Sequence, residues 1–600
     1  MKIKLSIFFL LFCLFSSSYE NIEPGNPLKE VTYCTSSFGE YRSTHFHGGV
    51  DFSTQGEEGH SVLAVGDGVI RRVRREAVGY GRVIYLDLND GRSAVYGHLI
   101  RFSRELGIEQ KLQLKCKEKG TSFPGDIIFD PPIKVKKGDV IGFSGQLGIG
   151  SPHLHLEIRR GDELRDPFFE GIPLVEMAKP KIDEIYFVPE DEGAMVDSSF
   201  FPERKEIVQL KNGDLTLSSC VVVSGKNDIY LSTYDEMGSQ TYKTFPSEIK
   251  GEIDGKEFFY LNFKGVSLSQ YKKSPFLFDI VDGKVFLVLR KDPNVILDEI
   301  RGEGLPILNA RHKIAITVSN RSNQKTTLSF DIEFENKEEQ IKKLPFDSFL
   351  IEKEDIFKNG VGLKIKPLSN KGETKIFLED DKASFFGHET KDGKWEILIP
   401  KSFFVGELTK IKIGENLLPC FYTSQNDFEI GRFIVEVPKE VLCKIKTSLN
   451  SIDIDVSPEG MRPFVKLGGY LKEKPKEAIF TNSYFFNYSG GKTKGLFKNR
   501  RYEIKEDKNP PKFVKVFKRK IPNINEDELS LIVKDDLSYV NAETMKIYID
   551  DERVYPDWDS DESSIRIDLT DIKKGEHFVS GSLYDVMGNL ASLPKTKFLR

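Results

Sequence analysis

Two runs near the N-terminus, Gly68-Val-Ile-Arg-Arg-Val73 and Arg82-Val-Ile-Tyr-Leu-Asp87, are rich in β-branched and aromatic residues. A third such run, Val62-Leu-Ala-Val65, precedes them, and breaks that contain glycine divide the three. Short apolar runs between turn residues are typical of β-strands. We therefore predict one compact antiparallel β domain from about Phe38 to Ile172, without a long amphipathic helix.

Beyond residue 175 the sequence changes to longer alternating runs and repeats itself weakly. His312-Lys-Ile-Ala-Ile-Thr-Val-Ser-Asn320 is echoed by His577-Phe-Val-Ser-Gly-Ser-Leu-Tyr-Asp585, and turn residues follow both. The second copy ends in Asp585-Val-Met-Gly-Asn589, which resembles the last hairpin turn of bacterial immunoglobulin-like domains. The resemblance implies β-sandwich modules. His312 and His577 start equivalent strands of the repeat, so we expect both to be structural.

Length and composition indicate a folded, multidomain protein. Six hundred residues, at roughly 150 per domain, predict about four domains. The chain is 39% hydrophobic and 30% charged and contains 45 Phe and 21 Tyr, which excludes a disordered or collagen-like class. Its net charge of -5 provides no basic field for binding phosphates, so nucleic acid is not an expected partner.

The N-terminus has the features of a secretory signal peptide. Two lysines precede an apolar run from Leu5 to Phe15, and Ser16-Ser-Ser18 suits cleavage before residue 19. This run is too short to cross a hydrocarbon layer of about 30 Å, which argues against a membrane anchor. A phenylalanine before Cys13 argues against a lipoprotein signal. We expect an exported protein, in the periplasm, the cell envelope or outside the cell, with no transmembrane helix in the mature chain.

Cysteines are too sparse for a disulfide scaffold. Removal of the signal peptide leaves an odd number of them, so at most two disulfide bonds can form, and the sequence does not say which. These cysteines are Cys34, Cys116, Cys220, Cys420 and Cys443, of which the last two are the closest pair in the sequence.

Histidines gather at the N-terminus, where six of the nine lie in the first 160 residues. His47 and Asp51 are four positions apart with two glycines between them, and both residue types are suitable zinc ligands. His153 and His155 alternate on a predicted strand, so both imidazoles point to the same face. His47, Asp51 and one histidine of this pair give three protein ligands. A fourth position is then left for water, as in catalytic rather than structural zinc sites.

These residues belong to a longer series of motifs: Phe38-Gly-Glu-Tyr-Arg-Ser-Thr-His-Phe-His-Gly-Gly-Val-Asp51, Ala64-Val-Gly-Asp-Gly-Val69, Gly79-Tyr-Gly81, Tyr96-Gly-His-Leu99, Val135-Lys-Lys-Gly-Asp-Val-Ile-Gly142, Ser144-Gly145 and Pro152-His-Leu-His-Leu-Glu-Ile-Arg159. The series resembles the lysostaphin/LytM-type zinc metallopeptidases, which cut peptide cross-links of bacterial cell walls. It follows the order of that family and covers about a fifth of the chain.

The resemblance implies a role for each matching residue. It implies that His47, Asp51 and His155 bind one Zn²⁺ ion and that His98 and His153 are catalytic histidines that do not bind the metal. Tyr41 stands where some members have a tyrosine that stabilises the oxyanion, so it is a candidate substrate-binding residue. The substrate implied is a peptide of peptidoglycan.

Two stretches depart from the family pattern. Residues 146–152 lack the usual Asn-Thr-Gly before the paired histidines, and residues 102–134 form an excursion that is longer than in compact members. Neither stretch contains a ligand. Of the remaining candidates, we expect His45 to line the groove or support a ligand, His60 to lie at the surface or in a loop, and Glu157 to be able to orient a ligand imidazole.

The predicted fold is mainly β, with an antiparallel β-sheet peptidase domain followed by several β-sandwich, immunoglobulin-like domains. The predicted segments are a signal peptide (1–18), the LytM-type zinc peptidase domain (19–178), an immunoglobulin-like domain (179–335), one or two β-rich domains of uncertain type (336–509) and a C-terminal immunoglobulin-like domain (510–600). A protein partner in the envelope that binds through the immunoglobulin-like domains is a further expectation.

Two alternatives to an exported zinc endopeptidase stay open. One is a non-enzymatic protein that binds cell-wall peptides or activates another hydrolase on a peptidase-like fold. The retention of all five ligand and catalytic positions favours an enzyme. The other is a surface adhesin or scaffold of β-sandwiches, which the length supports but no binding motif does.

Overall fold

The computed structural model describes most of the chain after the predicted signal peptide, which lies outside the described residues. These are residues 24–30, 33–42, 44–174, 178–237, 242–336, 340–378, 381–405, 408–424, 428–430, 433–437, 442–448, 451–457, 464–467, 477–481, 484–486 and 500–600. Within these ranges, no helix combines the length and the hydrophobicity that crossing a membrane requires.

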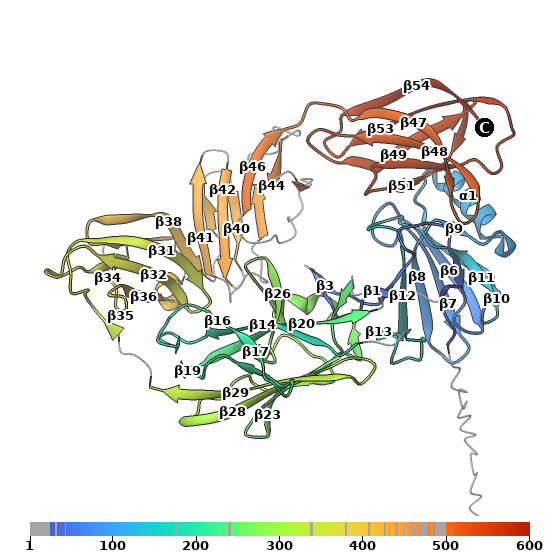
Figure 1. Ribbon diagram of the computed structural model, residues 1–600. Coiled ribbons are helices and arrows are strands. Elements are labelled where there is room, and N and C mark those ends of the chain that lie inside the picture. The colour runs from blue at the N-terminus through green and yellow to red at the C-terminus, as the bar shows by residue number, and fades with distance from the viewer. Residues whose placement is uncertain are drawn as a thin grey trace, which may run out of the picture.

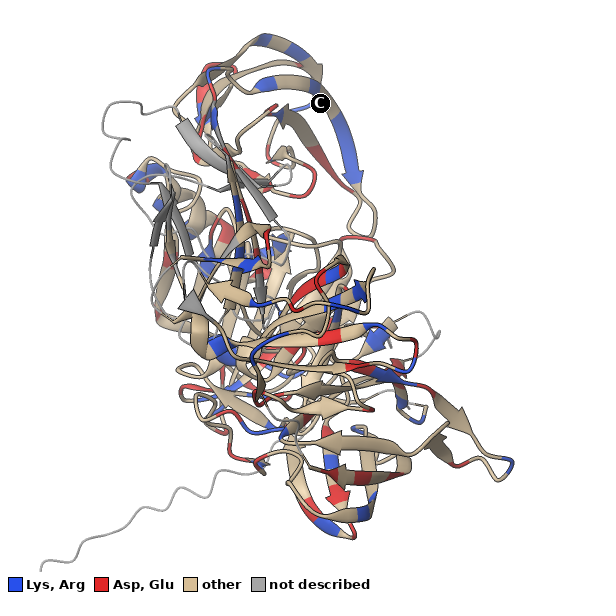
Figure 2. Cartoon of the chain, turned by 90° about the vertical axis from the view of Figure 1, so that its left-hand side faces the viewer, with Lys and Arg blue, Asp and Glu red and all other residues tan. Residues whose placement is uncertain are grey.

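The fold class predicted from the sequence is confirmed, because β-sheets with mostly antiparallel strands build each part of the chain (Figure 1). In Figure 2 acidic and basic residues are interspersed along the strands, in keeping with the small net charge.

The first domain is a β-sheet domain whose main sheet has the order β1-β4-β12-β8-β7-β6-β10, with a smaller sheet β5-β11-β9 beside it. Its core is built from alternate residues of these strands, among them Val50, Ile84, Tyr96 and Leu154. Its elements are β1 (Cys34–Ser36), β2 (Tyr41–Arg42), β3 (His45–Phe46), β4 (Val50–Ser53), β5 (Ser61–Leu63), β6 (Gly68–Arg75), β7 (Arg82–Leu88), β8 (Ser93–Leu99), β9 (Arg101–Phe102), η1 (Arg104–Leu106), α1 (Ile108–Lys119), β10 (Gly125–Val135), β11 (Val140–Phe143), β12 (His153–Arg160) and β13 (Glu163–Arg165).

Residues 102–134 leave the sheet as predicted, but they contain a helix, α1, that the sequence analysis did not predict. Only Ile108, Leu112 and Cys116 of this helix are buried, at intervals of four residues. Glycines in the left-handed conformation, Gly107 and Gly120, stand at its two ends. Because only one residue in four is buried and most of the others are polar or charged, the sequence shows only a weak helical periodicity, and the helix was not predicted.

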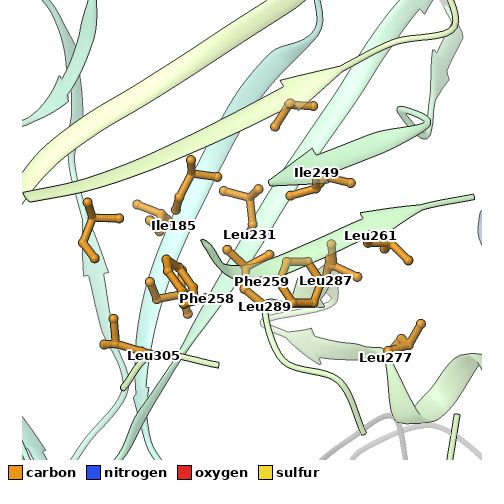
Figure 3. Close-up of a cluster of buried hydrophobic side chains, with 14 of the residues drawn as sticks. Ile185, Leu231, Ile249, Phe258, Phe259, Leu261, Leu277, Leu287, Leu289 and Leu305 are labelled. Atoms are coloured by element: carbon orange, nitrogen blue, oxygen red, sulfur yellow. The ribbon is translucent and has the colours of Figure 1, made fainter. Parts of the chain in front are cut away.

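The second domain packs two sheets around a core of aliphatic and aromatic side chains (Figure 3). The sheets have the orders β16-β14-β20-β26-β25 and β15-β19-β29-β28-β22-β23-β27. The elements are β14 (Lys181–Pro189), β15 (Met195–Val196), β16 (Glu203–Lys205), β17 (Ile207–Gln209), β18 (Leu215–Leu217), β19 (Val221–Ser224), β20 (Asn227–Met237), β21 (Tyr242–Thr244), β22 (Glu248–Ile253), β23 (Lys256–Asn262), β24 (Gly265–Ser267), η2 (Tyr271–Phe276), β25 (Phe278–Val281), β26 (Lys284–Val288), β27 (Ile300–Arg301), β28 (Ala310–Ser319) and β29 (Lys325–Glu335).

A third β-rich region follows, with a core that includes Val361, Ile397 and Tyr422. Its sheets have the orders β30-β35-β36-β32-β31, β34-β33-β37-β38-β41-β42-β46-β44-β45 and β39-β40-β43. The elements are β30 (Gln340–Ile341), β31 (Phe349–Phe357), β32 (Gly360–Pro367), β33 (Ile376–Leu378), β34 (Asp381–Lys382), β35 (Phe385–Glu389), β36 (Trp395–Pro400), η3 (Lys401–Phe404), β37 (Thr409–Ile413), β38 (Asn416–Ser424), β39 (Phe428–Ile430), β40 (Phe433–Glu436), β41 (Leu442–Ser448), β42 (Ser451–Ser457), β43 (Phe464–Leu467), β44 (Glu477–Thr481), β45 (Tyr484–Phe486) and β46 (Arg500–Glu506).

The last domain is a sandwich of two sheets, β47-β48-β52-β51 and β50-β49-β53-β54, around a core that includes Leu531, Ile547 and Ile565. Its strands are β47 (Lys512–Ile521), β48 (Glu526–Lys534), β49 (Val540–Ile549), β50 (Glu552–Val554), β51 (Asp557–Asp559), β52 (Ser564–Asp568), β53 (Glu576–Asp585) and β54 (Leu590–Leu599).

The repeat seen in the sequence is also a repeat of contacts. His312 Nδ1 lies 2.6 Å from Asp254 Oδ2, and its Nε2 lies 2.7 Å from the carbonyl of Asn309. His577 makes the same pair of contacts, with Asp550 Oδ2 at 2.5 Å and the carbonyl of Lys573 at 2.8 Å. In both copies the same aspartate also accepts a hydrogen bond from the backbone N–H of the residue that follows the histidine. Each histidine therefore joins its strand to a neighbouring turn, which fits the prediction that both are structural.

The last domain returns to pack on the first through buried ion pairs (Figure 1). Asp557 lies 2.8 Å from both Arg75 Nε and Arg82 Nη2. Arg566, whose side chain is fully buried, donates two hydrogen bonds to Glu58, at 2.6 and 2.7 Å. These guanidinium and carboxylate groups come from opposite sides of the interface, so each domain neutralises charge that the other buries.

The second domain is joined to the first by a shared sheet and a shared core. Strand β24 pairs antiparallel with β13, so the main sheet of the first domain continues into the second. Phe46 of the first domain lies within the second domain's core, with its ring 5.4 Å from that of Phe263. Buried Arg321 forms an ion pair with Asp166 at 2.6 Å. The first domain is therefore held between the second and the last.

All five cysteines of the predicted mature chain are free thiols in the structure: Cys34, Cys116, Cys220, Cys420 and Cys443.

Candidate metal centre

Strands β4 and β12 bring a carboxylate and an imidazole together. The two strands pair antiparallel, and Asp51 stands directly opposite His155 in the register. Directly opposite residues of an antiparallel pair place their side chains on one face of the sheet. His47 enters from the glycine-containing turn just before β4, whose Gly49 leaves no room for a side chain because a Cβ there would lie 2.4 Å from the carbonyl oxygen of Leu156.

Three potential ligand atoms converge at this point. Asp51 Oδ1 lies 3.2 Å from His47 Nε2 and 2.8 Å from His155 Nδ1, and the two imidazole nitrogens are 3.2 Å apart. All three side chains are largely buried. This donor set of two imidazoles and one carboxylate is one that zinc accepts in catalytic sites. The residues that the resemblance implied as ligands are therefore brought together in a group that fits a metal ion.

Hydrogen bonds fix which nitrogen of each imidazole faces the centre. His47 Nδ1 lies 2.8 Å from the carbonyl oxygen of Ser37, which can only accept, so Nδ1 carries the proton and Nε2 is free to bind a metal. His155 is turned the other way: its Nε2 lies 3.1 Å from Glu157 Oε1, which leaves Nδ1 toward the centre. Partners of this kind orient ligand imidazoles and raise their basicity.

Glu157 is a buried carboxylate with two further hydrogen-bond partners. It accepts bonds from Arg159, with Nε at 2.7 Å, and from the hydroxyl of Tyr80. Burial alone would raise the pKa of Glu157, but the hydrogen bond to His155 and the charge of Arg159 outweigh it and lower the pKa to about 2. The expectation that Glu157 can orient a ligand imidazole fits this geometry.

The charges at the centre are strongly coupled. Burial would lower the pKa of His155, but its hydrogen bonds with Asp51 and Glu157 raise that pKa to about 9. Burial would raise the pKa of Asp51, but the neighbouring His47 and His155 hold it well below the usual range. Arg42 adds a further positive charge 3.7 Å from Asp51 Oδ2. The carboxylate is thus ionised and ready to bind a cation.

His98 and His153 stand beside the three ligand atoms as a pair, with ring centroids 4.6 Å apart. His98 Nδ1 lies 3.0 Å from the carbonyl of Leu147, and His153 Nδ1 lies 2.6 Å from that of Ser151, so the Nε2 atom of each is an acceptor. Burial and the nearby histidines lower the pKa of His98 to about 3, and burial also lowers the pKa of His153. Both imidazoles are therefore neutral at pH 7.

The backbone at His98 is in the left-handed region, with φ of 59°. This conformation is uncommon for a residue other than glycine and costs about 1 kcal/mol or more. Its persistence here, beside the ligand atoms, indicates that the surrounding contacts determine the position of the imidazole.

The loop that supports His98 is held by the last domain. Gln146 donates a hydrogen bond to Asp559 at 2.6 Å, and the hydroxyl of Ser560 donates to the carbonyl of Gly148 at 2.8 Å. Between them Leu147, whose carbonyl contacts His98, packs against Ile521 of β47. The C-terminal domain therefore contacts the loop on both sides of the group that orients this histidine.

Two tyrosines near the centre were not predicted as site residues. The ring of Tyr80 lies 5.6 Å from that of His155, and its hydroxyl donates to Glu157. The motif Gly79-Tyr-Gly81 was the available sequence signal for it. Tyr271, on η2 of the second domain, packs on His45 with centroids 4.7 Å apart. No local sequence signal could have placed it there.

The remaining candidates lie in different surroundings. The ring of Tyr41, on β2, lies 5.7 Å from that of Phe278 and packs against the core of the second domain, so its role at the oxyanion stays a prediction. Burial and the neighbouring His47 lower the pKa of His45 to about 4. His60 is partly exposed and lies 3.5 Å from Glu30.

Comparison with known proteins bears on the same region. The description "Peptidase family M23" belongs to the family model that matches residues 45–114, a stretch that contains His47, Asp51 and His98. Part of the first domain is therefore similar to the M23 peptidases, and the first domain is called the M23 domain below. M23 domains are zinc metallopeptidases, and the cluster of His47, Asp51 and His155 is a group that could hold the metal.

Solved structures similar to this chain fall into two groups. The catalytic domain of a mutant of the prophage-encoded M23 protein EnpA from Enterococcus faecalis is 22% identical, with a TM-score of 0.17, and the match covers 23% of this chain and 87% of that one. The SpoIIQ-SpoIIIAH pore-forming complex is 20% identical, with a TM-score of 0.19, over 25% of this chain and 91% of that one.

The second group matches more of the chain at lower identity. A Bacteroides ovatus protein, SGBP-B of a mixed-linkage glucan utilisation locus, is 10% identical with a TM-score of 0.11, over 68% of this chain and 70% of that one. No curated protein matches this chain in sequence.

Proposed function

We propose that the M23 domain is an exported zinc-dependent endopeptidase that hydrolyses peptide bonds in peptidoglycan cross-links. The observation that carries the proposal is the convergence of His47, Asp51 and His155 beside a pair of neutral histidines. Three protein ligands leave a zinc ion with an open position, the arrangement of catalytic sites.

A bound zinc ion polarises a carbonyl group and lowers the pKa of a bound water to about 7. The protein's own groups do the rest. Glu157 holds His155 in the orientation that presents Nδ1, and Ser37 does the same for Nε2 of His47. The two nitrogens and the carboxylate of Asp51 then meet at one point without rearrangement.

His98 and His153 supply the proton transfers of hydrolysis. One accepts a proton from the attacking water through its free Nε2, and the same proton is then available to the leaving amine. The Nε2 of the other, nearby, is also an acceptor, so this histidine can donate to the oxygen on which negative charge develops only after it has taken up a proton itself. Both Nδ1 atoms bond to carbonyl oxygens, so the two Nε2 atoms are equivalent in protonation and either histidine can take either role.

The immunoglobulin-like domains are proposed to place the enzyme in the cell envelope and to offer a surface to a protein partner there. The contacts of the second and last domains with the M23 domain support a further role, because Tyr271 and the loop of Asp559 and Ser560 reach residues beside the site. These domains would then help to shape the groove that admits the peptide.

Mass spectrometry of fragments released from defined muropeptides tests the proposal. Full-length protein should release cross-link fragments, a chelator should stop the release, and added zinc should restore it. Asp51→Ala should lose bound zinc in elemental analysis. His153→Ala should retain zinc but lose at least about a hundredfold in rate. His60→Ala is the matched control and should behave as the parent.

Two results would contradict the proposal. Parental activity of His153→Ala would remove the assigned role of that histidine. Retention of zinc without any fragment release, in every muropeptide tried, would instead favour the non-enzymatic binding or hydrolase-activating protein.

A further inference from the structure

Three aspartates meet at the end of the last domain where the chain enters it. Asp507 lies between β46 and β47, and Asp535 and Asp536 follow β48 directly. Each offers a carboxylate oxygen, and these oxygens lie within 4.8 Å of one another. Asn589 joins a fourth carboxylate to the group, because its Nδ2 donates to Asp585 Oδ2 at 2.8 Å and to the carbonyl of Asp507 at 3.2 Å.

Among the residues that the structure describes, two oxygens of this cluster are buried without a hydrogen-bond donor. Asp507 is 1% exposed; its Oδ1 accepts a bond from the backbone N–H of Asn509 at 3.1 Å, whereas its Oδ2 is buried and accepts none. Asp535 repeats the pattern, with Oδ1 accepting from the backbone N–H groups of Leu537 and Ser538 at 2.9 and 2.6 Å and Oδ2 buried without a donor. In both residues, therefore, Oδ1 accepts the hydrogen bonds of the local turn and Oδ2 has no part in them.

A buried carboxylate oxygen without a donor or a counter-ion is costly. Within the part of the chain that the structure describes, neither Asp507 nor Asp535 forms a salt bridge that could compensate. The cluster therefore gathers carboxylates, and the described residues supply no cation within salt-bridge distance of Asp507 or Asp535.

We propose that Asp507, Asp535 and Asp536 bind a calcium ion. Oxygen-only donors exclude the softer metals that prefer imidazole or thiolate. Calcium takes six to eight oxygens in irregular geometry, whereas magnesium dehydrates reluctantly and keeps several waters. A site with two buried carboxylate oxygens leaves little room for the waters that magnesium keeps, which favours calcium.

The ion would cross-link the entry segment of the last domain to the loop after β48. That loop also lines a cavity of about 650 Å³, whose other walls include Trp558 and, from the M23 domain, Ala77 and Val78. The ion would therefore fix the end of the sandwich that faces the M23 domain. This role is independent of the zinc site and of the reaction proposed there.

The test uses the full chain, stripped of metals and reloaded with one equivalent of zinc. Thermal unfolding should shift upward by about 5 °C at saturating CaCl₂. Tb³⁺, a calcium substitute, should give luminescence sensitised by Trp558, and CaCl₂ should displace it. Asp507→Asn should weaken the apparent calcium affinity at least tenfold.

The unfolding temperature of Asp507→Asn without calcium distinguishes loss of a calcium ligand from misfolding. Asp507→Asn removes like-charge repulsion, so without calcium it should unfold at a temperature equal to or above that of the parent. Asp551→Asn is the matched control: Asp551 is exposed, pairs with Lys595 at 2.7 Å and has a left-handed backbone that asparagine tolerates. It should keep the parental calcium response.

Three outcomes would overturn the proposal. One is the absence of a thermal shift and of Tb³⁺ luminescence at millimolar metal. Another is an equal shift in NaCl of matched ionic strength or in MgCl₂. The third is a calcium response of Asp507→Asn that equals that of the parent.

Discussion

Replacement of Arg566 by methionine should detach the last domain from the M23 domain. The guanidinium is fully buried and binds three carboxylates: Glu58 at 2.6 and 2.7 Å, Glu528 at 2.7 Å and Asp559 at 3.2 Å. Methionine keeps much of the apolar packing but leaves these carboxylates with less positive charge around them. Removal of one partner of a buried ion pair costs about 3–5 kcal/mol, so the expected loss of unfolding free energy is of that size.

Urea denaturation followed by the fluorescence of Trp558 measures this loss. The chain has two tryptophans, so the measurement is made in a Trp395→Phe background, where Trp558 of the last domain alone reports. Multidomain chains do not unfold in one step, and a local reporter confines the result to the last domain and its interface. Arg311→Met, at an exposed arginine paired with Asp331, is the control and should leave the midpoint unchanged.

Glu58→Gln provides the decisive second variant, because Glu58 lies in the M23 domain. If contact with the M23 domain stabilises the last domain, Glu58→Gln must lower the urea midpoint that Trp558 reports. The double variant should then show a coupling energy of about 1.5 kcal/mol or more. A transition of Trp558 that does not respond to Glu58→Gln, or a loss below about 1 kcal/mol in Arg566→Met, would refute the reasoning.

Three further predictions concern the metal centre. Glu157→Gln should weaken zinc binding about 10- to 100-fold in a chelator competition, because His155 loses the carboxylate that orients it; unchanged affinity would contradict this. Tyr80→Phe removes one bond to Glu157 and should lower kcat/KM about tenfold with zinc retained, measured on a defined muropeptide; loss of zinc would contradict the assignment. Zinc binding at pH 7.5 should release about one proton from His155, whose pKa in the metal-free protein is about 9, as measured by calorimetry in two buffers of different ionisation enthalpy. Since this pKa lies above the ordinary 6.5, His155 stabilises the metal-free fold fully below pH 6.5 and loses that contribution as the pH rises through 9, so stability that increases over this range would be inconsistent.

Much of the candidate metal centre could be predicted from the sequence, because the spacing of its residues along the chain limits where their side chains point. The alternation of His153 and His155 on one strand, and the short spacing from His47 to Asp51, both limit where the side chains can point. The structure then adds the register of β4 and β12, which sets Asp51 opposite His155. Sequence spacing predicted His47, Asp51 and one histidine of the pair, the family resemblance implied His155, and the pairing of β4 and β12 explains why these side chains converge.

Contacts between domains were beyond the reach of the sequence. Tyr271 meets His45 only because η2 packs on the first domain, and Asp559 meets Gln146 across 413 positions of chain. No periodicity or motif encodes which surfaces of two folded domains match. For the same reason, the sequence alone treated the modules after residue 178 as separable from the peptidase.

The ion pair between Glu58 and Arg566 joins residues 508 positions apart, which has a consequence for the order of folding. At about 5–20 residues per second, synthesis delivers Arg566 about 25–100 s after Glu58. During this interval the acidic and basic side chains of the first domain's interface are solvated and lack their partners. The loop beside His98 likewise waits for Asp559 and Ser560. The M23 domain therefore acquires these contacts only after the last domain has been synthesised and has folded.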